Sequence, residues 1–169
     1  LYQQLNNNTG IDLYGTYNNS SAKGLFQFNY KTKKNFKIID KINPDIIIWA
    51  AGEKNLKKTE LSLAATLNNN LNPFISLINC KSVNNKTKII FLSSDYVFDG
   101  ISGGYKVTDN TNPKSNYGTA KVMCEKYLMN NHFNYNIIRA GGILGQDSLF
   151  LKWLVQSIKK DDSIELFDN

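Results

Sequence analysis

The chain has 169 residues, of which 41% are apolar and 12% aromatic, a composition typical of one globular domain with a sizeable core. The formal net charge is +6, but 19 of the 20 basic residues are lysine, and this argues against a nucleic-acid partner because arginine is the usual bidentate reader of phosphate and guanine. No apolar run approaches the roughly 18 residues that a membrane span needs, so we expect no membrane association.

The two cysteines indicate a reducing compartment. Cys80 and Cys124 lie in helix-like segments and lack the spacing of metal ligands. We therefore expect buried free thiols rather than a disulfide, and no metal site built by the protein. The first residues show no secretory signal pattern. Together these features predict a cytoplasmic protein.

Short apolar runs alternate with helical stretches along the chain. The opening LYQQLNNNTG reads as the latter part of a helix that ends near Gly10. Further strands and helices are predicted in turn, with strands at 11–17, 25–30, 45–50, 88–93 and 134–140, and helices at 32–42, 57–82, 115–131 and 148–160. Pro73 predicts a kink or break in the second of these helices. The alternation predicts an α/β fold with a doubly wound parallel sheet.

The residues that follow the strands are the first candidates for a site, because a doubly wound sheet binds ligands beyond the carboxyl ends of its strands. Small residues follow the strands at 45–50 and 134–140, where the sequence reads AGEKN and AGGILG. Such residues let a ligand approach the backbone closely. The strand at 88–93 ends differently, in SSDYVFDG at 93–100. Two hydroxyls and an acid at the end of an apolar strand indicate a chemical site.

A second motif lies on the next predicted helix. Tyr117 and Lys121 are four residues apart, so they share one helix face. A free phenol has a pKa of about 10, and a nearby ammonium favours the phenolate and brings that pKa toward the working range of an acid–base catalyst. A Tyr-x-x-x-Lys pair is common by chance. Its position about two dozen residues after Ser94 makes it informative, because the topology then brings the three side chains to one sheet edge.

These motifs, together with NPDIIIWAAG at 43–52 and IIRAGGILG at 137–145, resemble those of the extended short-chain dehydrogenase/reductases. The family's catalytic trio is a Ser or Thr at the end of a central strand and a Tyr-x-x-x-Lys pair on the next helix. SSDYVFDG most resembles the subfamily of dTDP-4-dehydrorhamnose reductases. Dehydratases of the family usually have an acid where Tyr96 stands, and epimerases a small residue where Asp95 stands.

The resemblance implies a role for each matched residue. Tyr117 would give a proton to the oxygen of a reduced C4 ketone, Ser94 would hydrogen-bond that oxygen, and Lys121 would lower the pKa of Tyr117 and hold the nicotinamide ribose. The implied substrate-binding residues are Ser94, Asp95 and Tyr96. The implied cofactor-binding residues are Asn29, Tyr30, Ala50, Ala51, Gly52, Asn69, Ser93, Tyr117, Lys121, Ala140, Gly141 and Ile143.

The same resemblance implies a Rossmann-like NAD(P)-binding domain over residues 1–169, with the substrate lobe starting within 141–169. The family's Gly-x-x-Gly-x-x-Gly fingerprint, which in relatives would fall immediately before LYQQL, does not occur in the sequence. Relatives also continue beyond SIELFDN. We therefore expect a partial domain that lacks its first strand, its glycine loop and most of the substrate lobe.

The implied function is the NAD(P)H-dependent reduction of a nucleotide-linked 4-keto-6-deoxy sugar by a homodimer. The segment TYNNSSAK at 16–23 has no acid for a ribose 2′-hydroxyl and ends in a lysine, which slightly favours NADP(H) over NAD(H). One alternative is a sugar-nucleotide epimerase or a bifunctional epimerase–reductase. Another is a non-catalytic subunit that binds the dinucleotide and regulates a partner, although the intact Ser94, Tyr117 and Lys121 trio favours an enzyme.

Overall fold

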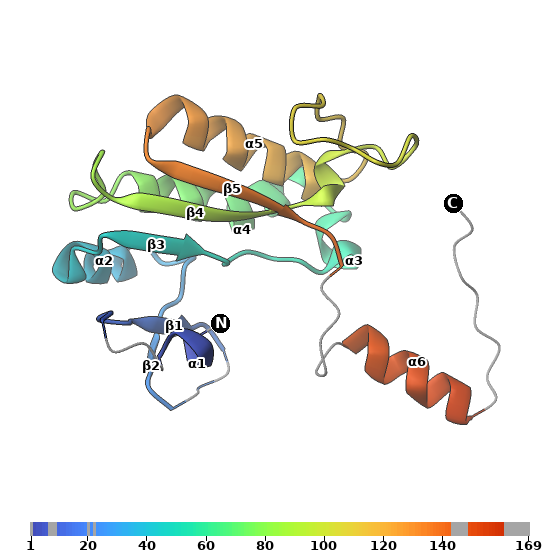
Figure 1. Ribbon diagram of the computed structural model, residues 1–169, viewed down its shortest axis with the longest axis horizontal. Coiled ribbons are helices and arrows are strands. Elements are labelled where there is room, and N and C mark those ends of the chain that lie inside the picture. Colours follow the sequence, from blue (N-terminus) through green and yellow to red (C-terminus); the bar gives the residue numbers. More distant parts are fainter. Residues whose placement is uncertain (1, 7–9, 20, 22, 143–148, 161–169) are drawn as a thin grey trace. The chain divides into compact units, whose positions relative to one another are not determined.

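The computed structural model describes residues 2–6, 10–19, 21, 23–142 and 149–160 (Figure 1). The chain divides into two units, Leu1–Arg139 and Ala140–Asn169, which are treated separately. The expected α/β fold with parallel strands is confirmed. The described helices of the first unit are α1 (Tyr2–Leu5), α2 (Lys37–Ile42), α3 (Leu56–Thr59), α4 (Leu63–Ile78) and α5 (Asn116–Asn131). Its strands are β1 (Gly15–Tyr17), β2 (Leu25–Gln27), β3 (Ile46–Trp49), β4 (Lys88–Ser94) and β5 (Tyr135–Ala140), which ends at the boundary. Two 3-10 turns, Lys33–Phe36 and Asp95–Val97, also lie in this unit. The second contains α6 (Leu149–Lys159).

The described strands form two sheets. β1 and β2 pair in parallel and are three residues long, shorter than the strands expected at 11–17 and 25–30. The other sheet has the order β3-β4-β5, and β3 pairs with β4 in parallel from Ile46 opposite Lys88 to Trp49 opposite Phe91. Parallel neighbours need a crossover connection, and α4 supplies the one from β3 to β4. The carboxyl ends of β3 and β4 therefore lie at the same edge.

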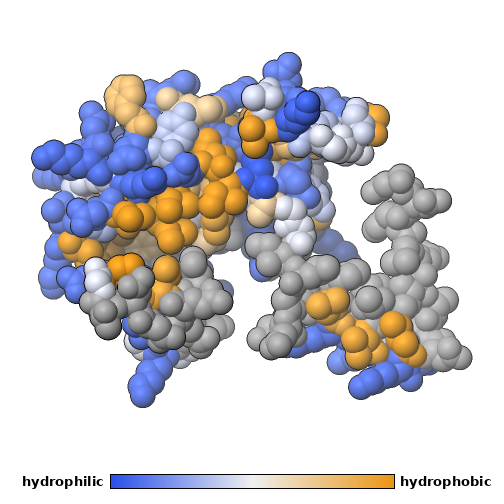
Figure 2. All heavy atoms as spheres, viewed as in Figure 1, coloured by the Kyte–Doolittle hydropathy of each residue, from blue (hydrophilic) through white to orange (hydrophobic). Residues whose placement is uncertain are grey.

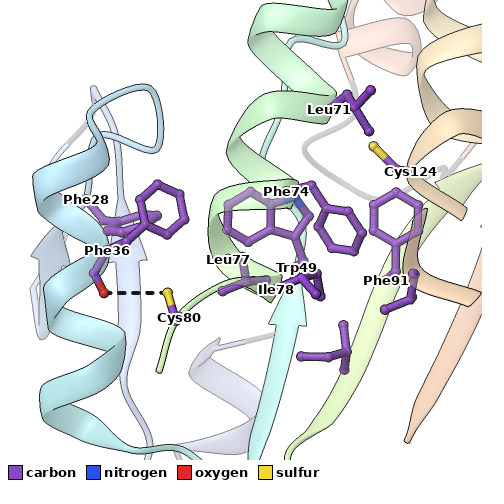
Figure 3. Close-up of a cluster of buried hydrophobic side chains, with 12 residues drawn as sticks. Phe28, Phe36, Trp49, Leu71, Phe74, Leu77, Ile78, Cys80, Phe91 and Cys124 are labelled. Carbon is purple, nitrogen blue, oxygen red and sulfur yellow. Dashed lines mark hydrogen bonds between the residues drawn. The ribbon is translucent and has the colours of Figure 1, made fainter. Parts of the chain in front are cut away.

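A row of buried aromatic rings forms the centre of the core (Figure 3). Trp49 of β3 lies 6.0 Å from Phe74 of α4, and Phe74 lies 4.7 Å from Phe91 of β4, measured between ring centroids. Phe28 and Phe36 extend the row beyond Trp49. Because side chains alternate along a strand, Ile89 and Phe91 both point into this core. The core thus fixes β4 against α4 and sets the position of the strand end that follows Phe91.

The opposite face of the three-stranded sheet is apolar and more open. Figure 2 shows apolar side chains gathered over these strands. Ile46 and Ile138 contribute to the exposed apolar surface, at 57% and 47% exposure. Of the helices that the structure describes, none is long and apolar enough to span a membrane.

The helix expected at 57–82 is divided, but not at the proline. The break lies between α3 and α4, where Ser62 caps α4 by accepting a hydrogen bond from the Ala65 amide at 3.3 Å. Pro73 lies inside α4, and the helix continues through it to Ile78. Of the kink or break predicted at Pro73, the break does not occur, because Phe74 and Leu77 are completely buried and hold this part of the helix in the core.

Candidate active site

The end of β4 places two serines in different environments. Ser93 and Ser94 are both buried, and successive side chains of a strand point to opposite faces. Ser94 is extended and begins the 3-10 turn Asp95–Val97, where its hydroxyl oxygen accepts a hydrogen bond from the Tyr96 amide at 3.3 Å. The same hydroxyl donates to Asp95 at 2.9 Å. The sequence SSDY thus turns the chain sharply at the strand edge and fixes the Ser94 side chain there.

Helix α5 carries Tyr117 and Lys121 next to this edge. Ser115 starts the helix by accepting a hydrogen bond from the Gly118 amide at 3.0 Å. Lys121 is 7% exposed, and its ammonium donates to the Leu92 carbonyl of β4 at 2.8 Å. The ammonium also lies 5.6 Å from the centre of the Tyr117 ring. Helix and strand are therefore tied together at the point where both present polar side chains.

Close packing fixes the start of α5 against the 3-10 turn. A Cβ atom added to Gly118 would overlap the carbonyl oxygen of Tyr96. The rings of Tyr96 and Tyr117 meet edge to face, with their centroids 5.8 Å apart. Only glycine fits at position 118, and its lack of a side chain lets Tyr117 lie this close to the strand end.

Burial is the largest influence on the pKa values of Tyr117 and Lys121. It raises the pKa of the Tyr117 phenol above its usual value, and the Ser94 hydroxyl opposes part of that rise. Burial lowers the pKa of the Lys121 ammonium, and the neighbouring Cys124 and Glu125 oppose this. The direction of the Tyr117 pKa shift is the reverse of what the Tyr-x-x-x-Lys pairing predicted, because burial desolvates the phenol and the nearby Asp95 and Tyr96 add to the rise. Tyr117 therefore holds its proton at neutral pH.

A pocket opens beside these side chains. Its lining comes from the segment after β3, from α4 and from α5, and consists of Ala50, Ala51, Gly52, Glu53, Lys54, Asn70, Tyr117 and Lys121. Gly52 has a φ of +146°, and a Cβ atom there would overlap the side-chain oxygen of Asn70. The Asn70 side chain donates to the Thr66 carbonyl at 3.0 Å, while its buried oxygen has no hydrogen-bond partner among the described residues. An unpartnered buried acceptor in a pocket is a place where a ligand donor would be stabilised.

The structure brings five of the twelve residues expected at the cofactor site together around this pocket. Ala50, Ala51 and Gly52 line the pocket with Tyr117 and Lys121. Asn69 does not line it; the next residue, Asn70, does. The signal that identifies Asn70 is the helical period, because Thr66, Asn70 and Phe74 form one buried stripe of α4 while Asn69 lies outside it. Glu53 and Lys54 also line the pocket, although the sequence analysis did not predict them there.

The other expected residues lie elsewhere. Asn29 is exposed after β2, and its side-chain oxygen accepts a hydrogen bond from the Lys31 amide at 3.0 Å. Tyr30 packs against the core. Asp95 and Tyr96 are exposed beside Ser94. Ala140 and Gly141 belong to the second unit, and Ile143 falls outside the described residues.

The fold and the site define a class of protein. A parallel α/β sheet with a pocket beyond the carboxyl ends of its strands is characteristic of Rossmann-like domains, and the serine at a strand end next to a Tyr-x-x-x-Lys helix resembles the short-chain dehydrogenase/reductases. The model of the RmlD substrate binding domain family matches residues 2–169, and the chain belongs to this family.

Individual relatives agree with the family assignment. The chain is 31% identical over 129 residues to a dTDP-4-dehydrorhamnose reductase of Aggregatibacter actinomycetemcomitans, covering 75% of this chain and 44% of that protein. It is 28% identical over 116 residues to the methionine adenosyltransferase 2 subunit beta of Xenopus tropicalis, covering 64% and 32%. The crystal structure of a hypothetical dTDP-4-dehydrorhamnose reductase from Sulfolobus tokodaii superposes with a TM-score of 0.83 at 25% identity, covering 96% of this chain and 57% of that one. The chain thus spans less than half the length of these two curated relatives.

Proposed function

We propose that the chain is the catalytic and dinucleotide-binding part of an NAD(P)H-dependent reductase of nucleotide-linked 4-keto-6-deoxy sugars. The observation that carries the proposal is the convergence of Ser94, Tyr117 and Lys121 at one sheet edge, beside the pocket that Gly52 and Asn70 line. The reductase relative of Aggregatibacter supports the substrate class.

The pocket residues fit a dinucleotide. Gly52 leaves the backbone after β3 open to close approach, and the unpartnered oxygen of Asn70 is an acceptor for a hydroxyl or amide donor. Ala50, Ala51 and Gly52 would hold the cofactor through the backbone, with Asn70, Tyr117 and Lys121 beside it. When bound, the reduced nicotinamide supplies a hydride to the carbonyl carbon of the sugar. The lysine and the missing acid in TYNNSSAK slightly favour NADP(H) over NAD(H).

The side chains divide the remaining chemistry among them. Tyr117 is protonated at neutral pH because burial raises its pKa, so it can give its proton to the oxygen of the ketone. Ser94 would turn its hydroxyl from Asp95 to that same oxygen and stabilise the charge that develops there. Lys121, whose ammonium lies 5.6 Å from the centre of the Tyr117 ring, would counter the negative charge of the phenolate that Tyr117 leaves behind. Asp95 and Tyr96, exposed at the same turn, would contact the sugar.

A second candidate is a non-catalytic, dinucleotide-binding regulatory subunit. The observation in its favour is the match to methionine adenosyltransferase 2 subunit beta, which covers 64% of the chain. A subunit of that kind has no need of a proton donor at Tyr117, so the trio favours the reductase. An epimerase or bifunctional epimerase–reductase on similar sugars is the nearest enzymatic alternative.

Compartment, domain boundary and assembly belong to the same proposal. A cytoplasmic location is supported by two buried free cysteines. Burial raises the pKa of Cys80 to about 11 and that of Cys124 to about 12, and this keeps both thiols unreactive. Residues 141–169 would begin the substrate lobe. A homodimer through α4 and α5 is supported by the exposed apolar side chains of Leu63, Met123 and Met129 on these helices.

The test measures NADPH oxidation by the full-length protein with dTDP- and UDP-4-keto-6-deoxy sugars. Replacing Tyr117→Phe removes the proton donor and should lower kcat by roughly 10²- to 10⁴-fold. The matched control is Tyr127→Phe, which removes a hydroxyl from the same helix that accepts a hydrogen bond from the Asn79 side chain at 3.1 Å, and it should keep full activity. Full activity in Tyr117→Phe would refute the mechanism. A wild type that binds NADPH but consumes none with any of these sugars would favour the regulatory subunit.

A further inference from the structure

Glu125 is a buried carboxylate that the proposed chemistry does not use. It lies on α5 one turn after Lys121 and is 1% exposed. Its Oε1 accepts hydrogen bonds from the Ser93 hydroxyl at 2.5 Å and from Nε of Arg139 at 3.2 Å, and its Oε2 accepts from Nη2 of Arg139 at 2.8 Å. A buried ion pair loses hydration and adds little net stability over apolar side chains of similar size. What a bidentate pair does provide is fixed direction.

The other side of Arg139 holds the loop that joins β4 to α5. Its Nη1 donates to the Val107 carbonyl at 3.2 Å, and its guanidinium lies 5.2 Å from the centre of the Phe98 ring. Phe98 stacks on Tyr105 with the ring centroids 4.4 Å apart and the planes at 5°. Residues 98–112 (the 98–112 loop) are thus bound to the guanidinium at two points, one by a hydrogen bond and one by a ring.

The 98–112 loop itself has a closed internal network. Tyr105 donates its hydroxyl to Asp99, and the side chain of Asn112 donates to the same carboxylate at 2.9 Å. The loop is therefore a folded unit, and Arg139 sets where that unit lies on the sheet edge. Because the loop runs from the Ser94 turn to the start of α5, its placement bears on both Ser94 and Tyr117.

We propose that Glu125 and Arg139 are positioning residues whose ion pair fixes the Ser93–Ser94 strand end and clamps the 98–112 loop, so that Ser94 and Tyr117 keep their relative placement. The Glu125 carboxylate holds the strand end by its hydrogen bond from Ser93. It holds the Arg139 guanidinium by two charge-assisted hydrogen bonds. The guanidinium in turn holds the loop. The catalytic consequence rests on the proposed reductase function, whereas the clamp on the loop does not.

The experiment separates stability from positioning with a double substitution. Glu125→Gln and Arg139→Met each leave one charged or polar partner buried without its mate, and both should shift the urea midpoint downward. The double variant Glu125→Met with Arg139→Met removes both charges and should recover most of that midpoint, since apolar replacement of a buried pair is close to neutral. The exposed Asn130→Met on the same helix is the control for a polar-to-apolar change.

Two measurements on the full-length protein then test whether the ion pair positions the 98–112 loop. The first is the native-state rate of cleavage by endoproteinase Lys-C after Lys106, an exposed residue of the 98–112 loop. The second is kcat and KM for NADPH oxidation with the keto sugar. A clamp predicts that the refolded double variant is cut at least 10-fold faster than wild type, and that its kcat falls at least 10-fold with little change in the KM for NADPH.

The possible results point in different directions. A stable double variant with wild-type cleavage and wild-type kcat would show that the pair only packs the core, and would overturn the proposal. If the double variant does not recover stability, Arg139→Lys tests the clamp instead. This variant keeps a positive charge for Glu125 but loses the bidentate guanidinium. An unchanged cleavage rate in Arg139→Lys would overturn the clamp. If the wild type has no reductase activity, the proposed function fails while the cleavage rate still tests the clamp.

Discussion

The buried ammonium of Lys121 predicts a specific dependence of stability on pH. Burial lowers the pKa of this group in the folded protein, whereas an unfolded lysine titrates near a pKa of about 10.4. Between those two values the unfolded chain binds a proton that the folded chain does not. The free energy of unfolding must therefore rise with pH in this window, by at most about 1.4 kcal/mol per pH unit for one group. Below the window the folded protein bears the full cost of the buried charge.

The substitution Lys121→Met isolates this effect. Methionine is apolar, has nearly the length of lysine and can keep the contact with Phe91, where the ammonium now lies 4.9 Å from the ring centre. It loses the hydrogen bond to the Leu92 carbonyl, which is worth about 1 kcal/mol, and relieves the desolvation of the charge. At pH 7 we therefore expect the variant to be about as stable as wild type or more stable, although it lacks the lysine of the proposed catalytic trio.

Urea unfolding followed by circular dichroism at half-unit steps from pH 7 to pH 10 measures the difference. The stability of wild type relative to Lys121→Met should rise as the pH rises. Tyr117 and Cys124 also face Lys121, but they titrate alike in the unfolded chains of the two variants and cancel in the difference, while in the folded protein burial raises the pKa of Tyr117 and raises that of Cys124 to about 12. Lys126→Met, an exposed lysine of the same helix, controls for the loss of one positive charge. A difference that stays flat or falls with pH would refute the buried, desolvated ammonium.

Two further predictions concern the packing and charge around the Ser94 turn. Gly118→Ala puts a methyl group against the Tyr96 carbonyl, and overpacking of this kind lowers the free energy of unfolding by about 1–3 kcal/mol. The higher helix propensity of alanine offsets up to about 1 kcal/mol of that loss. Gly10→Ala, with no atom within 4 Å of the added Cβ, should change the urea midpoint little, and equal effects of the two would contradict the close packing. Hydrogen bonds from the Tyr105 hydroxyl, the Ile101 amide and the Asn112 side chain together lower the pKa of Asp99 to about 2, so the stabilising charge is present above the unfolded pKa of about 3.9 and is lost as pH falls through about 2. Carboxyl-carbon NMR should give that midpoint in wild type, and Tyr105→Phe should raise it; an unmoved midpoint would contradict the hydrogen bond.

The parts of the site that the sequence predicts are those set by local periodicity. An apolar run gives β4 and places Ser94 at its end, since a strand has only two faces and one carboxyl end. The spacing of Tyr117 and Lys121 puts both on one face of α5 whatever surrounds the helix. These inferences need no tertiary information, because the rise and turn of each element fix them.

The parts that the sequence did not predict depend on burial. The direction of the pKa shift of Tyr117 follows from how much water the folded chain removes, which no spacing of residues reports. The run of three asparagines at 68–70 contains one buried member, and the resemblance to a family motif selected Asn69 rather than Asn70. The continuity of α4 through Pro73 is likewise a result of packing, since the local rule for proline predicts a kink or a break.

Helix α5 offers a signal that would have found Glu125 from the sequence. Its buried face includes Lys121 and Glu125 at a spacing of four, in series with Tyr117 four residues earlier. A helix that packs on a sheet normally presents apolar residues at those positions, and a buried charge needs a partner on another element. Three polar side chains on the inward stripe therefore imply that the facing strands supply matching groups. The structure supplies them as the Leu92 carbonyl for Lys121 and as Arg139 for Glu125. Polar residues that interrupt the apolar stripe of a packed helix are thus evidence of a site, and the register of the stripe says which residues of the helix build it.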